Sequence, residues 1–158
     1  MDSSEISTLK LLLAQQPVAA LATLHDGEPA VSMVPFAMFA DAAGFVIHVS
    51  RLATHTNDML LNAAVALLVT GPVAETPLAL PRVSIQGRAR RCEPASSQYE
   101  QARAVYLAKL PDAEELFTFA DFSLFVIEPV AARFVAGFGR ARSLTAERLQ
   151  TVLRDNAA

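Results

Sequence analysis

Hydrophobic residues near the N-terminus recur with the spacing of a helix. Asp2 or Ser4 can cap this segment, and Pro17 lies where the pattern stops. The pattern predicts a helix over about residues 4–15, and "TAERLQTVLRDN" behind Thr145 predicts a second over about residues 145–155. The apolar positions of the first helix are Ile6, Leu9, Leu12 and Leu13.

Between these two helices the hydrophobic period is mostly that of β-strands. The dipeptide Asp26-Gly27 predicts a tight hairpin between the first two strands. Gly87 predicts a bulge or bend within a long strand. The predicted strands are "VAALATLH", "PAVSMVPFAMF", "FVIHVS", "VALLVTG", "RVSIQGRARRCE", "FSLFVIEP" and "ARFVAGFG".

Helical segments interrupt the strands without a regular strand–helix alternation. "THTNDMLLNA" has helical character, and "SSQYEQARAVYLAKLP" places apolar residues at helical spacing behind a Ser cap, with "DAEELF" adding a turn or two. Six or seven strands in this arrangement favour a mainly β (α+β) chain. We expect a closed or partly open antiparallel barrel with peripheral helices rather than a doubly wound parallel sheet.

Composition narrows the class of protein. With 158 residues, 53% of them hydrophobic, one domain over residues 1–158 is expected. The net charge of -3 argues against a binder of nucleic acid or of acidic membranes. The lone Cys92 cannot form an internal disulfide, and no apolar run has the roughly 20 residues of a membrane span, so a soluble cytoplasmic protein is predicted. The Pro-rich connection over residues 71–81 has no assigned role.

A polar junction stands out between two apolar segments in "FVIHVSRLATHTNDMLLN", residues 45–62. A strand that ends at Ser50 and a helix that begins near Thr54 leave backbone N–H groups open where the helix dipole favours an anion. The junction therefore predicts a phosphate site. The alternative is that a threonine only caps the helix and Arg51 is solvated. The side chains able to donate to phosphate are Ser50, Arg51, Thr54, His55, Thr56 and Asn57.

Other candidate chemistry is sparse. The histidines 25, 48 and 55 form no pair at ligand spacing, so no metal site is predicted, and His48 is either a site residue on one strand face or a hydrogen-bonded core imidazole. In "RARRCE", strand alternation puts Arg88 and Arg90 on one face and Arg91 on the other. These arginines are either a solvated edge or a cofactor-facing patch. No acid–base or nucleophile constellation emerges, so the catalytic residues stay unknown.

Four stretches together resemble a known family. They are "VSMVPFAMFADAAGFVIHVSRLATHTNDMLLN", "PRVSIQGRARR", "YLAKLPDAEELFTFADFSLFVIEP" and "RFVAGFGRA", which cover most of the chain. The chain is similar to the split barrels that bind flavin mononucleotide (FMN) and include pyridoxamine 5'-phosphate oxidase, most of all to their haem-utilisation branch. The resemblance implies a six-stranded split barrel that forms a homodimer with FMN sites at the interface.

The resemblance also implies a function and a cofactor site. We expect an FMN-dependent oxidoreductase acting on an unidentified small molecule. The alternatives are a non-catalytic flavin- or haem-binding protein of the haem-utilisation type, or a protein that binds a deazaflavin. The family's cofactor contacts correspond here to Met33, Val34, Pro35, Phe36, Val49, Ser50, Arg51, Thr54, His55, Thr56, Asn57 and Arg82.

The family's substrate contacts are only partly present. Tyr99 and Arg103 match a helix Tyr and Arg that hold the vitamin phosphate in the oxidases. However, Met38 and Leu107 replace a Lys and a Ser, and "GFGRARS" has no His at the expected place. A dianionic phosphate without these charge-assisted bonds binds poorly, which argues against pyridoxamine 5'-phosphate oxidase activity.

Overall fold

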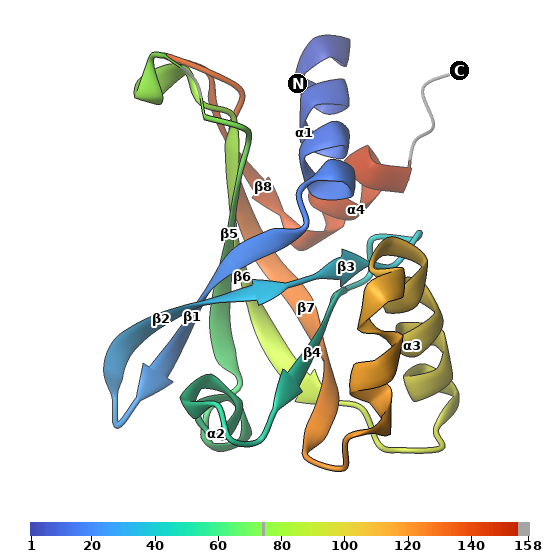
Figure 1. Ribbon diagram of the computed structural model, residues 1–158. Helices are drawn as coiled ribbons and strands as arrows, with labels where there is room; N and C mark the ends of the chain where they lie inside the picture. The colour runs from blue at the N-terminus through green and yellow to red at the C-terminus, as the bar shows by residue number, and fades with distance from the viewer. Residues whose placement is uncertain (74, 155–158) are drawn as a thin grey trace.

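A curled antiparallel sheet forms the centre of the computed structural model, which describes residues 1–73 and 75–154 (Figure 1). The strand order is β2-β1-β5-β6-β7-β4-β3, and β8 pairs with β7. The mainly β (α+β) split barrel expected from the sequence is confirmed. The strands are β1 (Val18–His25), β2 (Glu28–Pro35), β3 (Ala37–Met38), β4 (Phe45–Ser50), β5 (Ala64–Thr70), β6 (Arg82–Arg91), β7 (Phe122–Val135) and β8 (Ala141–Thr145).

The sheet has eight strands, where the sequence pattern predicted six or seven and the resemblance implied six. The first and last strands in the spatial order, β2 and β3, are consecutive in the chain and are separated only by Phe36. β2 pairs with β1 before Phe36, and β3 pairs with β4 after it. One continuous stretch of chain therefore joins the two ends of the strand order, and the sheet curls back toward itself. β8 is the further addition to the six barrel strands.

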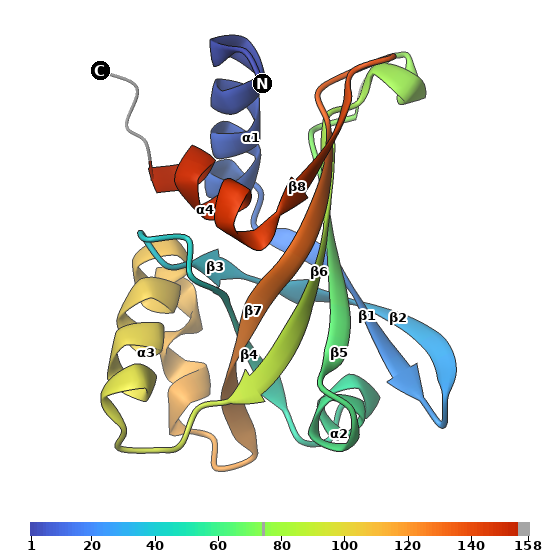
Figure 2. The ribbon, with the colours of Figure 1, turned by 180° about the vertical axis from the view of Figure 1, so that it is seen from behind.

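Helices lie around the ends of the sheet (Figures 1 and 2). α2 lies against β1, α3 against β3 and β4, and α1 next to α4. Among the described residues no helix has the length and apolar character needed to cross a membrane. The helices are α1 (Ser3–Gln15), α2 (Thr54–Leu61), α3 (Ser97–Lys109) and α4 (Ala146–Arg154), with 3-10 helices η1 (Pro77–Ala79) and η2 (Pro111–Thr118).

The predicted helix starts are confirmed by their caps. The Asp2 carboxylate accepts a bond from the Glu5 backbone N–H at 2.8 Å, and the Glu5 carboxylate accepts one from the Asp2 N–H at 3.0 Å. The Thr145 hydroxyl accepts from the Arg148 N–H at 3.2 Å and begins α4. Position 155, the expected end of this helix, lies outside the described residues.

Local turn chemistry also matches the prediction. Asp26 and Gly27 have φ values of 51° and 82°, which gives the tight hairpin between β1 and β2. The β6–β7 register shifts between Gln86 and Gly87, which confirms the bulge. A Cβ atom on Gly87 would lie 2.7 Å from the Glu128 carbonyl oxygen, so the close approach of the two strands requires glycine there.

The prediction of two separate strands after Phe122 was wrong. "FSLFVIEP" and "ARFVAGFG" belong largely to the single 14-residue β7, which runs through Pro129. Pro129 lacks an N–H but lies opposite Gly87 at the register shift, where the ladder is already interrupted. β8 was not among the predicted strands, the last of which ended with "GFG" at residues 137–139. A bend exists there, with Gly139 at a φ of 74°, and it returns the chain to pair with β7.

The two faces of β4 and β7 pack into different cores. The inward face joins the main core with α1, α2 and α4. The outward face packs against α3 in a second cluster, built from Ala37, Val46, Cys92, Ala102, Tyr106, Leu124 and Val126. Cys92 is buried in this cluster, and burial raises the pKa of its thiol, as expected of a structural cysteine.

His48 lies beside the second cluster among aromatic rings. Its ring stacks on Phe117 with a centroid distance of 3.9 Å and contacts Phe122 at 5.1 Å and Tyr106 at 5.9 Å. The side chain is buried, and the His48 Nδ1 atom has no hydrogen-bond partner. Burial therefore lowers its pKa from 6.5 to about 4. His48 is a neutral core imidazole, although one of its nitrogens lacks the expected hydrogen bond.

This burial predicts acid sensitivity of the fold. The unfolded chain binds a proton to His48 near pH 6.5 and the folded chain near pH 4, so stability is complete above 6.5 and falls as the pH drops through this window. We expect His48 to account for a loss on the order of 3 kcal/mol in the free energy of unfolding between pH 7 and pH 4. Urea denaturation of the wild type and of His48→Phe at several pH values measures this loss, and His48→Phe should lack it.

His25→Gln is the matched control. Asp58 raises the pKa of His25, so its contribution is present below pH 6.5 and is lost as the pH rises through the folded pKa. The two substitutions should therefore change the pH dependence in opposite directions. Identical pH profiles for the wild type and His48→Phe would contradict the interpretation.

Candidate functional site

The polar junction has the geometry expected from the sequence. β4 ends at Ser50 and α2 begins at Thr54, with Ala53 at the N-cap. Ala53 provides no side-chain cap bond, so the first turn of α2 is not capped by its own N-cap residue. Arg51 and Thr54 are exposed beside this turn, and His55 is half-buried, which lowers its imidazole pKa.

Most of the remaining donors of the junction bond within the protein. The Ser50 hydroxyl donates to Asp121 Oδ2 at 2.6 Å and accepts from the Leu52 N–H at 3.1 Å. The Thr56 hydroxyl is fully buried and donates to the Ser50 carbonyl at 2.6 Å. The Asn57 amide donates to the Arg51 carbonyl at 3.4 Å. The structure thus gathers these residues in one place, but it leaves few of their donors for a phosphate.

Asp121 is the member of the junction that sequence reasoning missed. It lies 71 positions after Ser50, immediately before β7, and its backbone carbonyl also accepts from the Arg51 N–H at 2.7 Å. Pairing of Ser50 with Phe122 across β4 and β7 brings it there, and no local sequence signal reveals that register. Its carboxylate places negative charge where the sequence predicted a phosphate, which opposes the binding of an anion.

The cofactor contacts expected at residues 33–36 point alternately outward and into the core. Met33 and Pro35 on β2 are exposed, whereas Val34 and Phe36 are buried in the core. Val49 on β4 is also buried. Val34, Phe36 and Val49 therefore support the barrel from inside, and only backbone atoms or the outward side chains of β2 are open to a ligand.

Arg82 and the polar junction lie at opposite ends of β7 in the folded chain. Arg82 pairs with Val135 at the end of β7, while Ser50 pairs with Phe122 at its beginning. The Arg82 guanidinium donates to the Leu80 carbonyl at 3.0 Å. The structure does not bring Arg82 and the junction together in one chain, so a ligand that touches both would need a second copy of the protein.

The two expected substrate residues lie on α3. Arg103 is half-buried, with its guanidinium carbon 5.1 Å from the Phe117 ring centroid and its Nη2 atom 3.9 Å from Glu114. Tyr99 packs against the second hydrophobic cluster. Both residues thus belong to the helical layer that packs on the outer face of β4. The Arg103 guanidinium already contacts the Phe117 ring and the Glu114 carboxylate.

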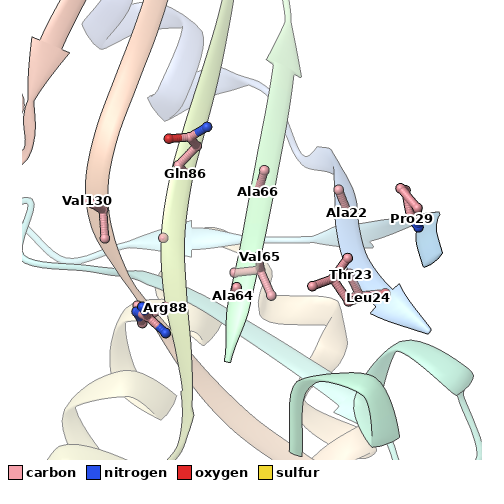
Figure 3. Close-up of a pocket in the computed structure, with 11 residues that line it drawn as sticks. Ala22, Thr23, Leu24, Pro29, Ala64, Val65, Ala66, Gln86, Arg88 and Val130 are labelled. Carbon is pink, nitrogen blue, oxygen red and sulfur yellow. The ribbon is translucent and has the colours of Figure 1, made fainter. Parts of the chain in front are cut away.

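A pocket of about 400 Å³ opens where β1 and β5 separate (Figure 3). The two strands pair only as far as Ala22 and Ala66, and the pocket lies beside and beyond this last pair. Small apolar residues form most of its lining, while Gln86 and Arg88 extend from β6 on its other side. The lining residues are Ala22, Thr23, Leu24, Pro29, Ala64, Val65, Ala66, Gln86, Gly87, Arg88 and Val130.

A chain of hydrogen bonds runs from the edge of this pocket to the hairpin. The Thr23 hydroxyl donates to Asp58 Oδ2 at 2.8 Å, and the Asp58 Oδ1 atom lies 2.8 Å from His25 Nδ1. Asp58 is buried and His25 is about half exposed. The hydrogen bond between them raises the pKa of His25 and lowers that of Asp58. The Asp58 carboxylate on Nδ1 fixes the orientation of the imidazole, and the Nε2 atom lies 3.7 Å from a carboxylate oxygen of the exposed Asp26.

A bare metal ion needs several ligating side chains close together. Across residues 1–73 and 75–154, no group of three or more His, Cys, Asp or Glu side chains is arranged to hold one.

The curled sheet, its outer helices and the strand order define a split-barrel protein. A family model described as pyridoxamine 5'-phosphate oxidase matches residues 7–136, and the chain belongs to this family. The resemblance inferred from the sequence is thereby confirmed.

Several proteins that are similar to this chain are named for their relation to haem. The chain is 39% identical over 120 residues to the chloroplastic haem oxygenase HOZ of Arabidopsis thaliana, covering 74% of this chain and 35% of that protein. A haem-binding protein from Mycobacterium smegmatis matches with a TM-score of 0.84 and 29% identity, covering 96% of this chain and 62% of the other. The haem storage protein HutZ from Vibrio cholerae has a TM-score of 0.71 and 24% identity, with coverages of 78% and 88%, and shows the shared fold. The chain thus spans about a third of HOZ and under two thirds of the Mycobacterium protein.

Asp121 should limit the affinity of the junction for FMN. Replacing Asp121 by Asn keeps a hydrogen-bond acceptor for Ser50 but removes the charge facing the phosphate. We expect FMN to bind about tenfold more tightly, because removing one nearby like charge is worth about 1–2 kcal/mol at a partly exposed site. Quenching of FMN fluorescence measures the affinity.

Asp112→Asn is the matched control, since it makes the same charge change at an exposed position on η2. It should leave FMN affinity at the wild-type value. Equal affinities for the two variants would show that the phosphate does not approach Asp121.

Proposed function

We propose that this protein binds haem and acts in haem utilisation. The observation that carries the proposal is the pocket at the β1–β5 separation, which combines a mostly apolar lining with Arg88. It is supported by the similarity to a haem oxygenase and to a haem-binding protein. When bound, haem supplies iron that binds and activates oxygen.

The residues of the pocket suit the shape and charge of this ligand. A porphyrin is planar and apolar with two carboxylates at one edge, and alanines at positions 22, 64 and 66 leave room for a flat ring to lie against the strands. Arg88 can pair with a carboxylate through its planar fork, and Gln86 adds an amide donor. The pocket is open to one side, so the protein covers one face of such a ligand.

Titration of the full chain with haem tests the proposal. The Soret band should shift and saturate, and Arg88→Ala should weaken binding about tenfold because it removes a charge-assisted bond worth about 1.5 kcal/mol. Arg91→Ala is the matched control, since strand alternation puts Arg91 on the other face of β6. It should bind like the wild type. A Soret band that stays at the position of free haem would contradict haem binding.

Two further variants locate the ligand within the same titration. Ala66→Trp fills the pocket and should abolish the shift, with circular dichroism to check that the fold is kept. His25→Ala asks whether the imidazole oriented by Asp58 reaches the iron, because loss of an axial nitrogen changes the Soret position even where affinity is retained.

A second candidate function is an FMN-dependent oxidoreductase acting on an unidentified small molecule. The family to which the chain belongs favours it. The site would use Arg51, Thr54 and His55 at the junction of one subunit and Arg82 of another, since these groups lie at opposite ends of β7. The internal bonding of Ser50 and the charge of Asp121 make FMN the weaker candidate, and a deazaflavin phosphate would meet the same opposition.

We also propose that the protein is a cytoplasmic homodimer with its cofactor sites at the interface. On the outer face of β2, Val31 and Met33 are 72% and 65% exposed, and they flank the small residues of β1. A second copy of the same chain would cover this apolar face and the open side of the pocket. A reducing compartment agrees with the single, buried Cys92.

Met33→Asp tests the dimer. A buried unpaired charge at the interface should convert the dimer to the 16.9 kDa monomer, as measured by size exclusion with light scattering. Leu61→Asp is the matched control, because Leu61 is 87% exposed but belongs to α2 rather than to β2, and it should leave the dimer intact. A wild-type protein with the mass of one chain would contradict the proposal.

A further inference from the structure

A second apolar pocket, of about 390 Å³, lies between the end of α1, β3 and the end of α3. It shares no lining residue with the pocket at the β1–β5 separation, and other elements form it. Apolar side chains make up its walls, and one ionisable group, Lys109, lines it. The apolar members include Leu13, Ala37, Met38, Ala40, Val105 and Ala108.

Lys109 is held in a defined position at the edge of this pocket. Its Nζ atom donates to the Leu13 carbonyl at 3.0 Å and lies 3.8 Å from the centroid of the Phe36 ring. Within the described part of the chain, no salt bridge joins Lys109 to a carboxylate. The hydrogen bond to Leu13 and the face of Phe36 are therefore the polar contacts that compensate for its removal from water.

This environment makes the amine unusually available as a nucleophile. Burial lowers the pKa of Lys109 from 10.5 to about 8. About a quarter of the side chains then carry a neutral amine at pH ~7.5, against about 0.1% for an ordinary lysine. A desolvated lysine in an apolar pocket is the arrangement that activates amines toward carbonyl compounds.

We propose that Lys109 and its pocket form a carbonyl-capture site that binds an apolar aldehyde as an imine. The Nζ lone pair adds to the carbonyl carbon, and the resulting carbinolamine loses water to form a C=N bond. One amine and one aldehyde give one imine and one water, with no change of oxidation state. The apolar walls accommodate the aldehyde substituent.

The alternative role for Lys109 is purely structural. Its bond to Leu13 links the last turn of α3 to α1 across 96 positions of sequence. A hydrogen bond that links two helices in this way requires a donor at Nζ but does not require the adjoining pocket. The two roles therefore differ in what happens to an aldehyde offered to the folded protein.

The chain allows an internally controlled experiment, because Lys10 and Lys109 are its only two lysines. The full-length protein is incubated with benzaldehyde and sodium cyanoborohydride, which reduces each imine to a stable secondary amine. Cleavage after glutamate separates Lys10, in residues 6–28, from Lys109, in residues 101–114. Mass spectrometry of these peptides gives the labelling of each lysine in the same sample.

We expect Lys109 to be labelled at least about tenfold faster than Lys10. Ala108→Phe, which fills the pocket but keeps the amine, should reduce the labelling of Lys109 to the level of Lys10. Glyoxylate, a charged aldehyde of smaller size, should show little preference for Lys109 because the walls of the pocket are apolar.

Two results would overturn the proposal. Equal labelling of the two lysines by benzaldehyde would leave only the structural role. Preferential labelling that persists unchanged in Ala108→Phe would show that the pocket takes no part. Both comparisons are made on chains that retain Lys109, so they do not depend on the folding of a Lys109 variant, and neither depends on haem binding.

Discussion

The pairing of β7 with three other strands is the constraint on which the rest of the structure depends. One edge of this 14-residue strand pairs with β6 along its length, while the other pairs first with β4 and then with β8. The change of partner occurs around Pro129, opposite the bulge at Gly87. Because Gly87 has no side chain, the strands stay in contact through the bulge and the sheet can bend there.

This arrangement also determines what surrounds each candidate site. Pairing of β4 with the first half of β7 places Asp121 beside Ser50, and packing of α3 on the outer face of the same two strands encloses His48. Elsewhere in the sheet, β1 pairs with β5 over only three positions. The two strands then separate and leave the pocket between them. The polar side chains of the junction are thus largely satisfied by hydrogen bonds within the protein, whereas the pocket between β1 and β5 is open to a ligand.

Signals confined to a few neighbouring residues were sufficient to predict much of the fold. The caps at Asp2 and Thr145 and the turn at Asp26-Gly27 each involve residues at most three positions apart, so their patterns are visible in the sequence. Asp121 and β8 were missed because their roles depend on strand register, which no local pattern encodes. The pocket was missed for the same reason: it exists where two strands stop pairing, and its lining residues are ordinary apolar strand residues.

The family's shared fold therefore does not determine which cofactor this chain selects. A phosphate needs unpaired donors, and the junction satisfies the Ser50, Thr56 and Asn57 side chains internally while placing a carboxylate among them. A porphyrin needs a broad apolar surface with a cation at its edge, and the open end of the β1–β5 pair offers both. The Asp121 carboxylate repels an anion at the start of α2, whereas Arg88 attracts one at the pocket, so the distribution of charge favours the pocket over the junction for an anionic ligand.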